Sequence, residues 1–319
     1  IVTGLVGSEM CIRDRLGFTS EREDEEGTHE FILDDSAGIV KAYEAVTQYC
    51  GWAPIEAGKT MGLFPYGQQN LNIPDIYTDY DGMSDWSTTN RDLIVPTYPN
   101  GAVVNQGRFT ELRNPPDLKK TDDLTQLQSR RDMAYAIQTE SEQMVLDLIR
   151  KAVKMSGEKN VVLSGGYGLN CVANYWYLEQ LKGEGINLFV EPVSNDAGTA
   201  IGAAYWHYHK VTKDREVKPM ITDLYYGPKY DYDIDYIKDL ANYYDATRIF
   251  EADHGDAVDL ITKKNIVAMF QGRSEAGPRA LGNRSIMYDP RDPDGKDHVN
   301  TIKRREYFRP FAGSILKEH

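Results

Sequence analysis

The chain of 319 residues contains little cysteine and no long apolar run. Its three cysteines, Cys11, Cys50 and Cys171, lack the spacing of a metal site or of a disulfide framework. No apolar stretch approaches the roughly 20 residues that a membrane-spanning helix requires. We therefore expect a soluble, cytoplasmic protein with no membrane partner. The length and the 41% of hydrophobic residues are enough for a substantial core in two domains.

The chain also lacks an overall positive charge. Lys and Arg number 36 against 49 Asp and Glu, so the net charge is -13, which argues against a nucleic-acid partner. Residues 270–319 differ, because they contain ten Lys or Arg and seven Asp or Glu. This local excess of positive charge favours a site for a small anion over a surface for a general polyanion.

The segment 271–285 combines Arg273, Arg279 and Arg284 with three glycines and a proline. It follows the apolar run 266–270, which is predicted to be a buried strand. Glycine lets a backbone approach a ligand closely, and the arginine fork fits phosphate and carboxylate oxygens. Two interpretations remain open: a pocket for a small, highly charged anion, or a structural turn with surface arginines.

Strands alternate with helices along the middle of the chain, which predicts an α/β layer. Helices are predicted over residues 38–49, 129–155, 170–181, 198–207, 231–244 and 257–263, and strands over 161–163, 187–190, 247–250 and 266–270. Ser129 and Asp132 are predicted to form a capping box. Residues 68–128 show no periodicity and are predicted to be an insertion packed by its own side chains. A linker is predicted near 213–227.

Two predicted strand-to-helix junctions carry short polar loops. The first is 164–168 (SGGYG) and the second is 195–199 (NDAGT). Glycines at such a junction let backbone N–H groups and the helix N-terminus face phosphate or ribose oxygens. A Gly-Gly turn alone is more often only a tight connection, but the second loop strengthens the prediction of a nucleotide site.

Four blocks of this sequence, taken in order, resemble the O-carbamoyltransferase family, which includes nodulation-factor and antibiotic carbamoyltransferases. The blocks are residues 58–67 (GKTMGLFPYG), residues 163–171 (LSGGYGLNC), residues 195–204 (NDAGTAIGAA), and the region of 271–285 with 289–291 (DPR) and 303–311 (KRREYFRPF). The resemblance runs from about residue 36 to the C-terminus. It implies a partial actin/sugar-kinase-like (ASKHA) α/β domain followed by a partial YrdC-like α/β domain.

The resemblance sets the predicted domains. Residues 16–220, with the insertion 68–128, are assigned to the actin-like domain, and residues 225–319 to an incomplete YrdC-like domain. Residues 1–15 are interpreted as non-native, because LVGSEMCIRDR is what a common transposon sequencing adapter encodes in one frame. The alternative interpretation is a short native strand and turn. Family members are longer at both ends, and their metal-binding histidine pair lies outside this chain. We expect this fragment alone to be inactive or nearly so, and no catalytic base can be assigned in it.

The resemblance implies functional residues in the actin-like domain. Nucleotide or carbamoyl adenylate would contact Gly165, Gly166, Asn170, Gly198 and Lys59, and Asp196 would bind a metal. Asp196 could instead cap the helix that begins at residue 197. Lys59 could be a solvated surface residue, because this chain has Ala where the family has Glu in Glu-Gly-Lys. The family often has Val-Ala where this chain has Tyr167 and Gly168.

The resemblance implies that the C-terminal domain binds carbamoyl phosphate and ATP. The implied contacts are Arg273, Arg279, Arg284, Lys303, Arg305 and Arg309, whereas one of Arg291 and Arg304 could point outward. Several cations are needed because two phosphorylated ligands bring many negative charges into one site.

The implied function is ATP-dependent O-carbamoyl transfer. Carbamoyl phosphate and ATP would give carbamoyl adenylate and pyrophosphate, and the carbamoyl group would then move to the hydroxyl of a small-molecule acceptor. ATP, carbamoyl phosphate and a divalent metal, Fe or Mg, are the implied cofactors. The alternatives are a tRNA threonylcarbamoyl-transferase relative, a sugar-kinase-like phosphotransferase and a noncatalytic nucleotide-binding protein of the same fold. The acceptor and the oligomeric state cannot be read from the sequence.

Overall fold

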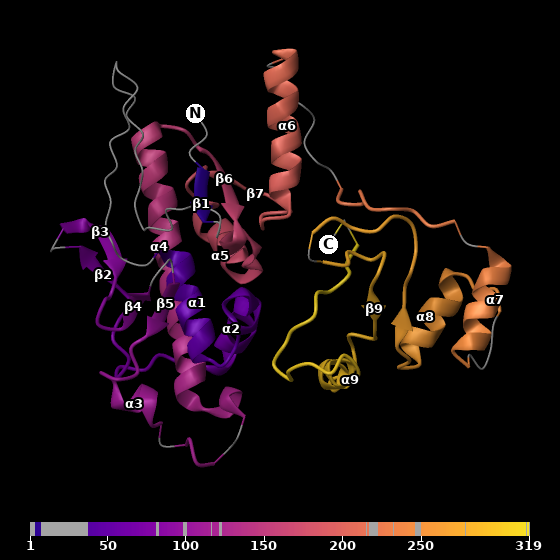
Figure 1. Ribbon diagram of the computed structural model, residues 1–319, viewed down its shortest axis with the longest axis horizontal. Coiled ribbons are helices and arrows are strands. Elements are labelled where there is room, and N and C mark those ends of the chain that lie inside the picture. The colour runs from indigo at the N-terminus through magenta and orange to yellow at the C-terminus, as the bar shows by residue number, and fades with distance from the viewer. Residues whose placement is uncertain are drawn as a thin grey trace. The chain divides into compact units, whose positions relative to one another are not determined.

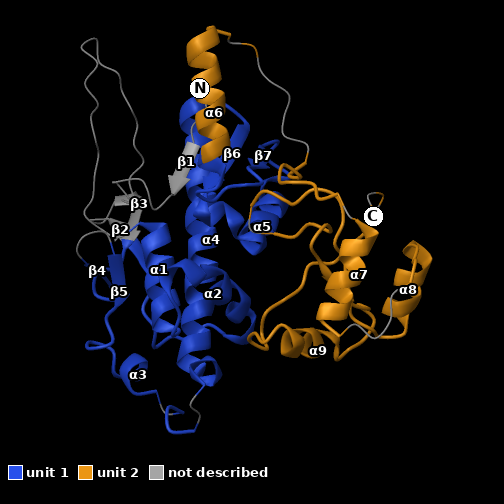
Figure 2. Cartoon of the chain, turned by 45° about the vertical axis from the view of Figure 1, so that its right-hand side comes forward, with its two compact units in different colours: residues 1–199 blue, residues 200–319 orange. Residues whose placement is uncertain are grey.

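The chain divides into two compact units, Ile1–Thr199 and Ala200–His319 (Figure 2). The computed structural model describes residues 4–7, 38–80, 83–97, 101–115, 117–120, 123–214, 216, 223–231, 233–245, 250–277, 279–316 and 318, with the backbone alone at 4–7, 79–80 and 83–88. The division falls N-terminal to the linker predicted near 213–227, at the beginning of a helix. None of the helices in these ranges is both long and apolar enough to cross a bilayer.

The first unit is built around α4 (Gln128–Ser156), the long helix on which α1 (Ile39–Tyr49) and α2 (Ala57–Leu63) pack (Figure 1). The buried side chains Met133, Ile137 and Met144 recur on α4 at four- and seven-residue spacing, which gives the helix one apolar face. Gly157 ends it in the left-handed conformation, with φ of 75°. The helices predicted over 38–49 and 129–155 are therefore confirmed.

A parallel sheet lies beside α4 (Figure 1). Its central strand is β6 (Asn160–Gly165), flanked by β1 (Gly4–Gly7) and β7 (Asn187–Val190). The 3-10 helix η4 (Gly166–Leu169) and then α5 (Cys171–Leu181) connect β6 to β7. Ile149 of α4, Leu163 of β6 and Tyr177 of α5 belong to one buried cluster. This β–α–β arrangement confirms the predicted α/β layer.

Strand β1 lies inside the segment that we interpret as non-native. Its backbone pairs with β6 in parallel register, Leu5 opposite Leu163. Excluding residues 1–15 from the fold therefore missed a strand. Any extended backbone can pair with an open sheet edge, so the adapter origin of these residues stays a prediction. The source DNA read tests it, and a clean genomic read through these codons would refute it.

The insertion 68–128 forms two antiparallel hairpins and two short helical segments. Their bounds are β2 (Tyr77–Tyr80), β3 (Met83–Thr89), β4 (Ile94–Thr97), β5 (Gly101–Val104), α3 (Thr110–Arg113) and η3 (Leu124–Gln126). It also depends on α4, because Glu140 Oε2 accepts hydrogen bonds from the backbone amides of Ile76 (2.6 Å) and Tyr77 (3.2 Å). The insertion is therefore also fastened to α4, a contact that the prediction of packing by its own side chains did not include.

The predicted capping box at the start of α4 is also wrong. The N-cap residue is Leu127, and its side chain makes no capping hydrogen bond. The Asp132 carboxylate instead accepts hydrogen bonds from the Gln68 amide (3.1 Å) and from Asn70 Nδ2 (2.9 Å). A carboxylate that already holds the incoming insertion is not free to turn back to the helix end.

The second unit buries little apolar surface. Its helices and strands are most of α6 (Gly198–Thr212), then α7 (Ile234–Tyr243), α8 (His254–Thr262), the β8 (Val267–Ala268) and β9 (Ile286–Met287) pair, and α9 (Gly295–Ile302). Leu224, Val299 and Phe308 are its only buried apolar side chains among the described residues. The predicted helices 198–207, 231–244 and 257–263 are confirmed in outline. The predicted strand 247–250 lies mostly outside the described residues.

The predicted buried strand 266–270 is wrong in both length and burial. Only two of its residues form β8, and Phe270 is 55% exposed. The Phe270 ring is covered in part by the guanidinium of Arg284, whose Cζ lies 3.7 Å from the ring centroid. An arginine thus occupies the place where an apolar layer would bury this run.

Candidate functional site

Two loops meet at the carboxyl ends of β6 and β7. The strands are neighbours, with Leu163 opposite Val190. Gly168, in the loop after β6, lies directly against Ser194, in the loop after β7, because a Cβ added to Gly168 would be 2.9 Å from Ser194 Oγ. In open α/β sheets, ligands bind outside the carboxyl ends of the strands. The structure therefore brings the two predicted polar loops together at a place suited to a ligand.

The first loop presents bare backbone. Gly165 has φ of 99°, a conformation that favours glycine and turns the chain out of β6. Gly166 follows, and a Cβ added there would meet no atom within 4 Å. The predicted nucleotide-binding glycines thus form a turn with open space beside it.

The second loop is tightly wound. The Gly198 amide donates to Asn195 O (2.9 Å), and a Cβ on Gly198 would lie 2.1 Å from Val193 O, so only glycine fits. Asp196 O accepts hydrogen bonds from Thr199 N (3.1 Å) and Thr199 Oγ1 (2.6 Å), and the Asp196 side chain is exposed. Asp196 thus supports the first turn of α6 through its carbonyl oxygen.

The described residues do not by themselves form a metal centre. No group of three or more His, Cys, Asp or Glu side chains with metal-binding geometry occurs among them. The Asp196 carboxylate is a suitable oxygen ligand for a hard cation, but a single carboxylate is not a binding site.

Asn170 points into the protein, away from the open side of the loop. It is 8% exposed, and its Oδ1 accepts from the Ala173 amide (3.1 Å), which caps α5. Its Nδ2 donates to Gln138 Oε1 (3.0 Å), and Gln138 Nε2 donates to Asn170 Oδ1 (3.2 Å). The prediction that Asn170 touches nucleotide remains untested. Gln138 could not be predicted as its partner, since a lone glutamine in a helix forms no motif.

Tyr167 also turns inward, which is how this chain accommodates its departure from the family's Val-Ala. Its hydroxyl donates to Ser141 Oγ (2.9 Å) and lies 3.3 Å from the Tyr177 hydroxyl. Burial raises the pKa of Tyr167 to about 12, so the ring serves as a neutral anchor.

Lys59 lies on α2 and forms an ion pair with Glu56, with 2.7 Å between Nζ and Oε1. Glu56 stands one position before the acid of the family's Glu-Gly-Lys pattern. One turn of helix brings it to Lys59, so the acidic partner is restored from a neighbouring position. A ligand role for Lys59 stays a prediction.

In the second unit, two of the predicted anion-binding arginines hold their own loop together. Arg284 Nη1 donates to Gln271 O (2.6 Å) and Asn283 O (2.9 Å). Arg273 Nη1 donates to Gly227 O (3.0 Å), and Asn283 Nδ2 donates to Arg273 O (2.8 Å). These contacts match the interpretation of this loop as a structural turn.

A second pair of arginines lies after α9. Arg305 Nε donates to Asn300 Oδ1 (2.5 Å), and Arg309 Nη1 lies 3.6 Å from Glu306 Oε2. Burial and the Arg309 charge lower the pKa of Arg305. The Arg309 charge thus opposes that of Arg305, and a bound anion would offset this repulsion. No hydrogen bond or ion pair within the described ranges joins this pair to Arg273 or Arg284, and Arg279 and Lys303 are exposed.

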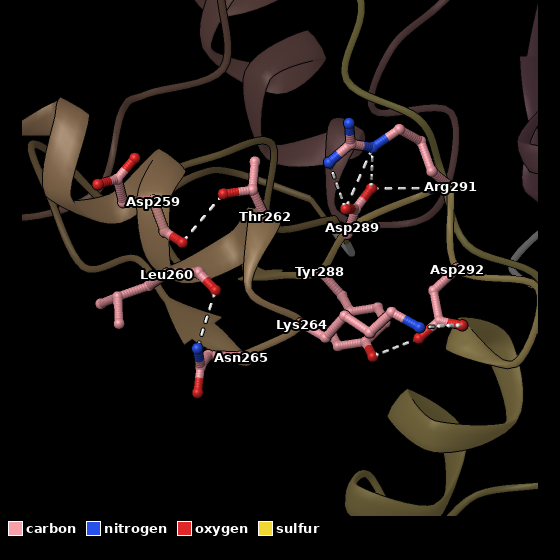
Figure 3. Close-up of polar contacts among 9 residues, drawn as sticks. All are labelled: Asp259, Leu260, Thr262, Lys264, Asn265, Tyr288, Asp289, Arg291 and Asp292. Atoms are coloured by element: carbon pink, nitrogen blue, oxygen red, sulfur yellow. Dashed lines mark hydrogen bonds and ion pairs between the residues drawn. The ribbon is translucent and has the colours of Figure 1, made fainter.

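Arg291 is committed to an internal ion pair. Figure 3 shows its guanidinium facing the Asp289 carboxylate, with Nε 2.9 Å from Oδ1 and Nη2 2.7 Å from Oδ2. The Arg291 side chain lowers the pKa of Asp289 to about 2. Tyr288 donates to Asp292 (2.7 Å), and Lys264 Nζ lies 3.3 Å from the same carboxylate. These side chains shape the loop that leads into α9.

Comparisons with known proteins identify the family of this chain. Residues 6–205 match the family model described as Carbamoyltransferase N-terminus, and residues 258–319 match Carbamoyltransferase C-terminus. An uncharacterized protein of Synechocystis sp. is 35% identical over 91% of this chain and 47% of its own length. Nodulation protein NolO of Bradyrhizobium diazoefficiens is 32% identical over 86% and 48%.

An enzyme of known name is also similar. The 3'-hydroxymethylcephem-O-carbamoyltransferase of Streptomyces clavuligerus is 34% identical over 47% of this chain and 27% of its own length. The chain spans about half the length, or less, of these curated relatives. The N-terminal family model by itself matches more than half of the chain. The chain therefore belongs to the carbamoyltransferase family.

Proposed function

We propose that the complete gene product is an ATP-dependent O-carbamoyltransferase. The observation that carries this proposal is the contact of the two loops at the carboxyl ends of β6 and β7, where Gly168 meets Ser194. The name of the Streptomyces relative supports transfer to a hydroxyl group. The parallel β6–α5–β7 arrangement supports an actin/sugar-kinase-like (ASKHA) domain, and the matched C-terminus supports a second, YrdC-like domain.

In this proposal the loops of the first unit bind carbamoyl adenylate. The amides around Gly165 and Gly166 donate to its phosphate, because bare glycine backbone suits an anion. Gly198, whose own amide donates to Asn195 O, shapes the loop beside them. Gly166 is exposed, and a Cβ added there would meet no atom within 4 Å, so this side of the turn is accessible to the adenylate. Asp196 supplies one metal ligand if a metal is bound, and the remaining ligands come from residues outside the described set.

The arginines of the second unit bind carbamoyl phosphate and ATP. The Arg309 charge lowers the pKa of Arg305, Glu306 is the acid paired with Arg309, and an added phosphate relieves the repulsion between the two arginines. Arg273, Arg279, Arg284 and Lys303 remain proposed ligands. For Arg273 and Arg284, ligand binding requires a guanidinium to exchange a loop carbonyl for a phosphate oxygen.

The proposed reaction has three steps. Water cleaves carbamoyl phosphate to carbamate and inorganic phosphate. A carbamate oxygen then attacks the α-phosphorus of ATP, forming carbamoyl adenylate as pyrophosphate leaves. The acceptor oxygen finally attacks the carbamoyl carbon, its proton is lost, and AMP leaves. The acceptor is a hydroxylated small molecule, and the protein acts in the cytoplasm.

The test incubates the folded complete gene product with ATP and carbamoyl phosphate and measures pyrophosphate. We expect pyrophosphate only when both substrates are present, because carbamate is the nucleophile. Omission of carbamoyl phosphate is the control. No pyrophosphate above that control, from protein that melts cooperatively, would reject the proposed adenylation.

A further inference from the structure

We infer that Gln138 is a positioning residue of the nucleotide loop, an inference that rests on the proposed function of that loop. Gln138 lies on α4 and is fully buried, with 0% of its surface exposed. It hydrogen-bonds to Asn170 in both directions, at 3.0 and 3.2 Å. The two residues are 32 positions apart, so this amide pair ties α4 to the junction between β6 and α5.

The Gln138 amide has no spare capacity. Its Oε1 accepts from the Tyr43 hydroxyl (2.6 Å) as well as from Asn170, and its Nε2 donates to Glu142 Oε1 (2.7 Å) as well as to Asn170. A primary amide offers two acceptor and two donor positions, and all four are used here. The Glu142 carboxylate requires a donor when ionised, and this fixes the orientation of the amide. A saturated buried network specifies one conformation.

The same face of α4 holds the other end of the turn. Ser141 lies three residues after Gln138, which places both on one face of the helix. Its Oγ accepts from the Tyr167 hydroxyl (2.9 Å), at the start of η4, while Gln138 binds Asn170, at the end of η4. The four-residue turn Gly166–Leu169 is thus held at both ends by hydrogen bonds to α4, an arrangement we call the clamp. Gly166 is left facing open space, as a preorganised anion-binding turn requires.

The experiment uses the complete gene product with AMP, the leaving nucleotide of the proposed reaction, as the probe. Gln138→Leu keeps the approximate volume and removes all four hydrogen bonds. The matched control is Gln143→Leu, because Gln143 is exposed on the same helix and donates to Asp147 alone (2.9 Å). AMP dissociation constants are measured by calorimetry, and pyrophosphate formation is measured in parallel.

We expect Gln138→Leu to weaken AMP binding by about 100-fold, since small displacements of a binding backbone have effects of this size. Pyrophosphate formation, assigned to the second unit, should change less than about twofold, and the control should leave both values within about twofold. Loss of both activities together in a Gln138→Leu protein that still melts cooperatively would overturn the selective positioning role. Unchanged AMP binding in a folded Gln138→Leu protein would overturn it as well.

Two further measurements keep the inference testable in every case. If Gln138→Leu does not fold, Ser141→Ala removes the hydrogen bond from the Tyr167 hydroxyl, together with the bond from Ser141 Oγ to Gln138 O within α4, and should weaken AMP binding about threefold. If the wild type neither binds AMP nor forms pyrophosphate, the proposed function fails, and hydrogen exchange tests the clamp by itself. The amides of residues 166–170 should then exchange about tenfold faster in Gln138→Leu than in Gln143→Leu. Equal exchange would refute the clamp.

Discussion

The glycine turn after β6 and the arginine loop after β8 are held in place by different kinds of contact. Both are glycine-rich segments that follow a short strand. In the first unit, buried side chains of α4 hold the turn from below, and the Gly166 backbone faces open space. In the second unit, Arg273 and Arg284 hold the loop with their own guanidiniums. The loop of the second unit is thus held by its own guanidinium groups, whereas the turn of the first unit is held by buried side chains of α4.

The difference in burial between the two units explains this contrast. The first unit has a contiguous cluster around Ile149, Leu163 and Tyr177. The described part of the second unit buries only Leu224, Val299 and Phe308 among apolar residues. Regions with few buried apolar contacts open more readily. We therefore expect the first unit to present a fixed site and the second to rearrange when an anion binds.

The largest expected effect tests the contrast in burial. Ile149→Ala removes a fully buried side chain from the cluster of the first unit and should lower the free energy of unfolding by about 2–5 kcal/mol. Val258→Ala, on α8 and 57% exposed, should change it by less than about 0.5 kcal/mol. Urea denaturation of both variants measures the difference. Equal effects would break the comparison between the units.

The next effect concerns the loop after β7. Gly198→Ala places a methyl group against Val193 O, whereas Gly202→Ala, on the same helix, meets no atom within 4 Å. Gly198→Ala should therefore weaken AMP binding about 100-fold through backbone displacement, and Gly202→Ala should have almost no effect. Calorimetric titration with AMP decides. A tight complex with Gly198→Ala would show that this loop does not form the site.

A smaller effect depends on pH. Burial raises the pKa of Glu140 from 4.5 to about 7, against the hydrogen bonds from Tyr77 and Ile76. The folded state then holds a proton that the unfolded state has lost. The resulting stability is complete below pH 4.5 and disappears as the pH rises through 7. We expect a change on the order of 2 kcal/mol, allowing for partial exposure.

Glu140→Gln removes this titration. Denaturation across pH 4.5 to 8 should show the wild type losing stability relative to the variant, with most of the loss complete near pH 7. Parallel curves for the two proteins would mean that the pKa of Glu140 does not differ between the folded and unfolded states. This result would weaken the view that the insertion is fastened to α4 through a desolvated carboxyl group.

The smallest effect separates two arginines of the second unit. Arg305→Gln in the complete gene product should raise the KM for carbamoyl phosphate about tenfold by removing one phosphate ligand. Arg291→Gln is the control, because its guanidinium is held by Asp289 and should not reach the substrate. Steady-state pyrophosphate release measures both. An equal increase in KM for the two variants would contradict the assignment of Arg305 as a ligand.

Much of the first unit could be predicted because its signals are local. The spacing of Met133, Ile137 and Met144 predicts α4, and the alternation of short apolar runs with helices predicts the β–α–β unit. The glycines of both junction loops are also visible, since Gly165 and Gly198 occupy positions that only glycine fits well. These features depend on residues that are near one another in the chain.

The features that could not be predicted depend on partners far apart in the sequence. Gln138 acquires its role from Asn170, and Asp132 is drawn from its helix end by Gln68 and Asn70. The predicted burial of residues 266–270 is wrong, because apolar composition does not show what packs on a strand. Here the Arg284 guanidinium lies on the Phe270 ring. Contacts between residues far apart in the chain produce no periodic pattern in the sequence.

The most direct test of the central claim is a crystal structure of the complete gene product with AMP bound. We predict the AMP phosphate within hydrogen-bond distance of the backbone amides of Gly165 or Gly166, at the ends of β6 and β7, with Asn170 still paired to Gln138. A nucleotide bound elsewhere, with both junction loops empty, would contradict the account.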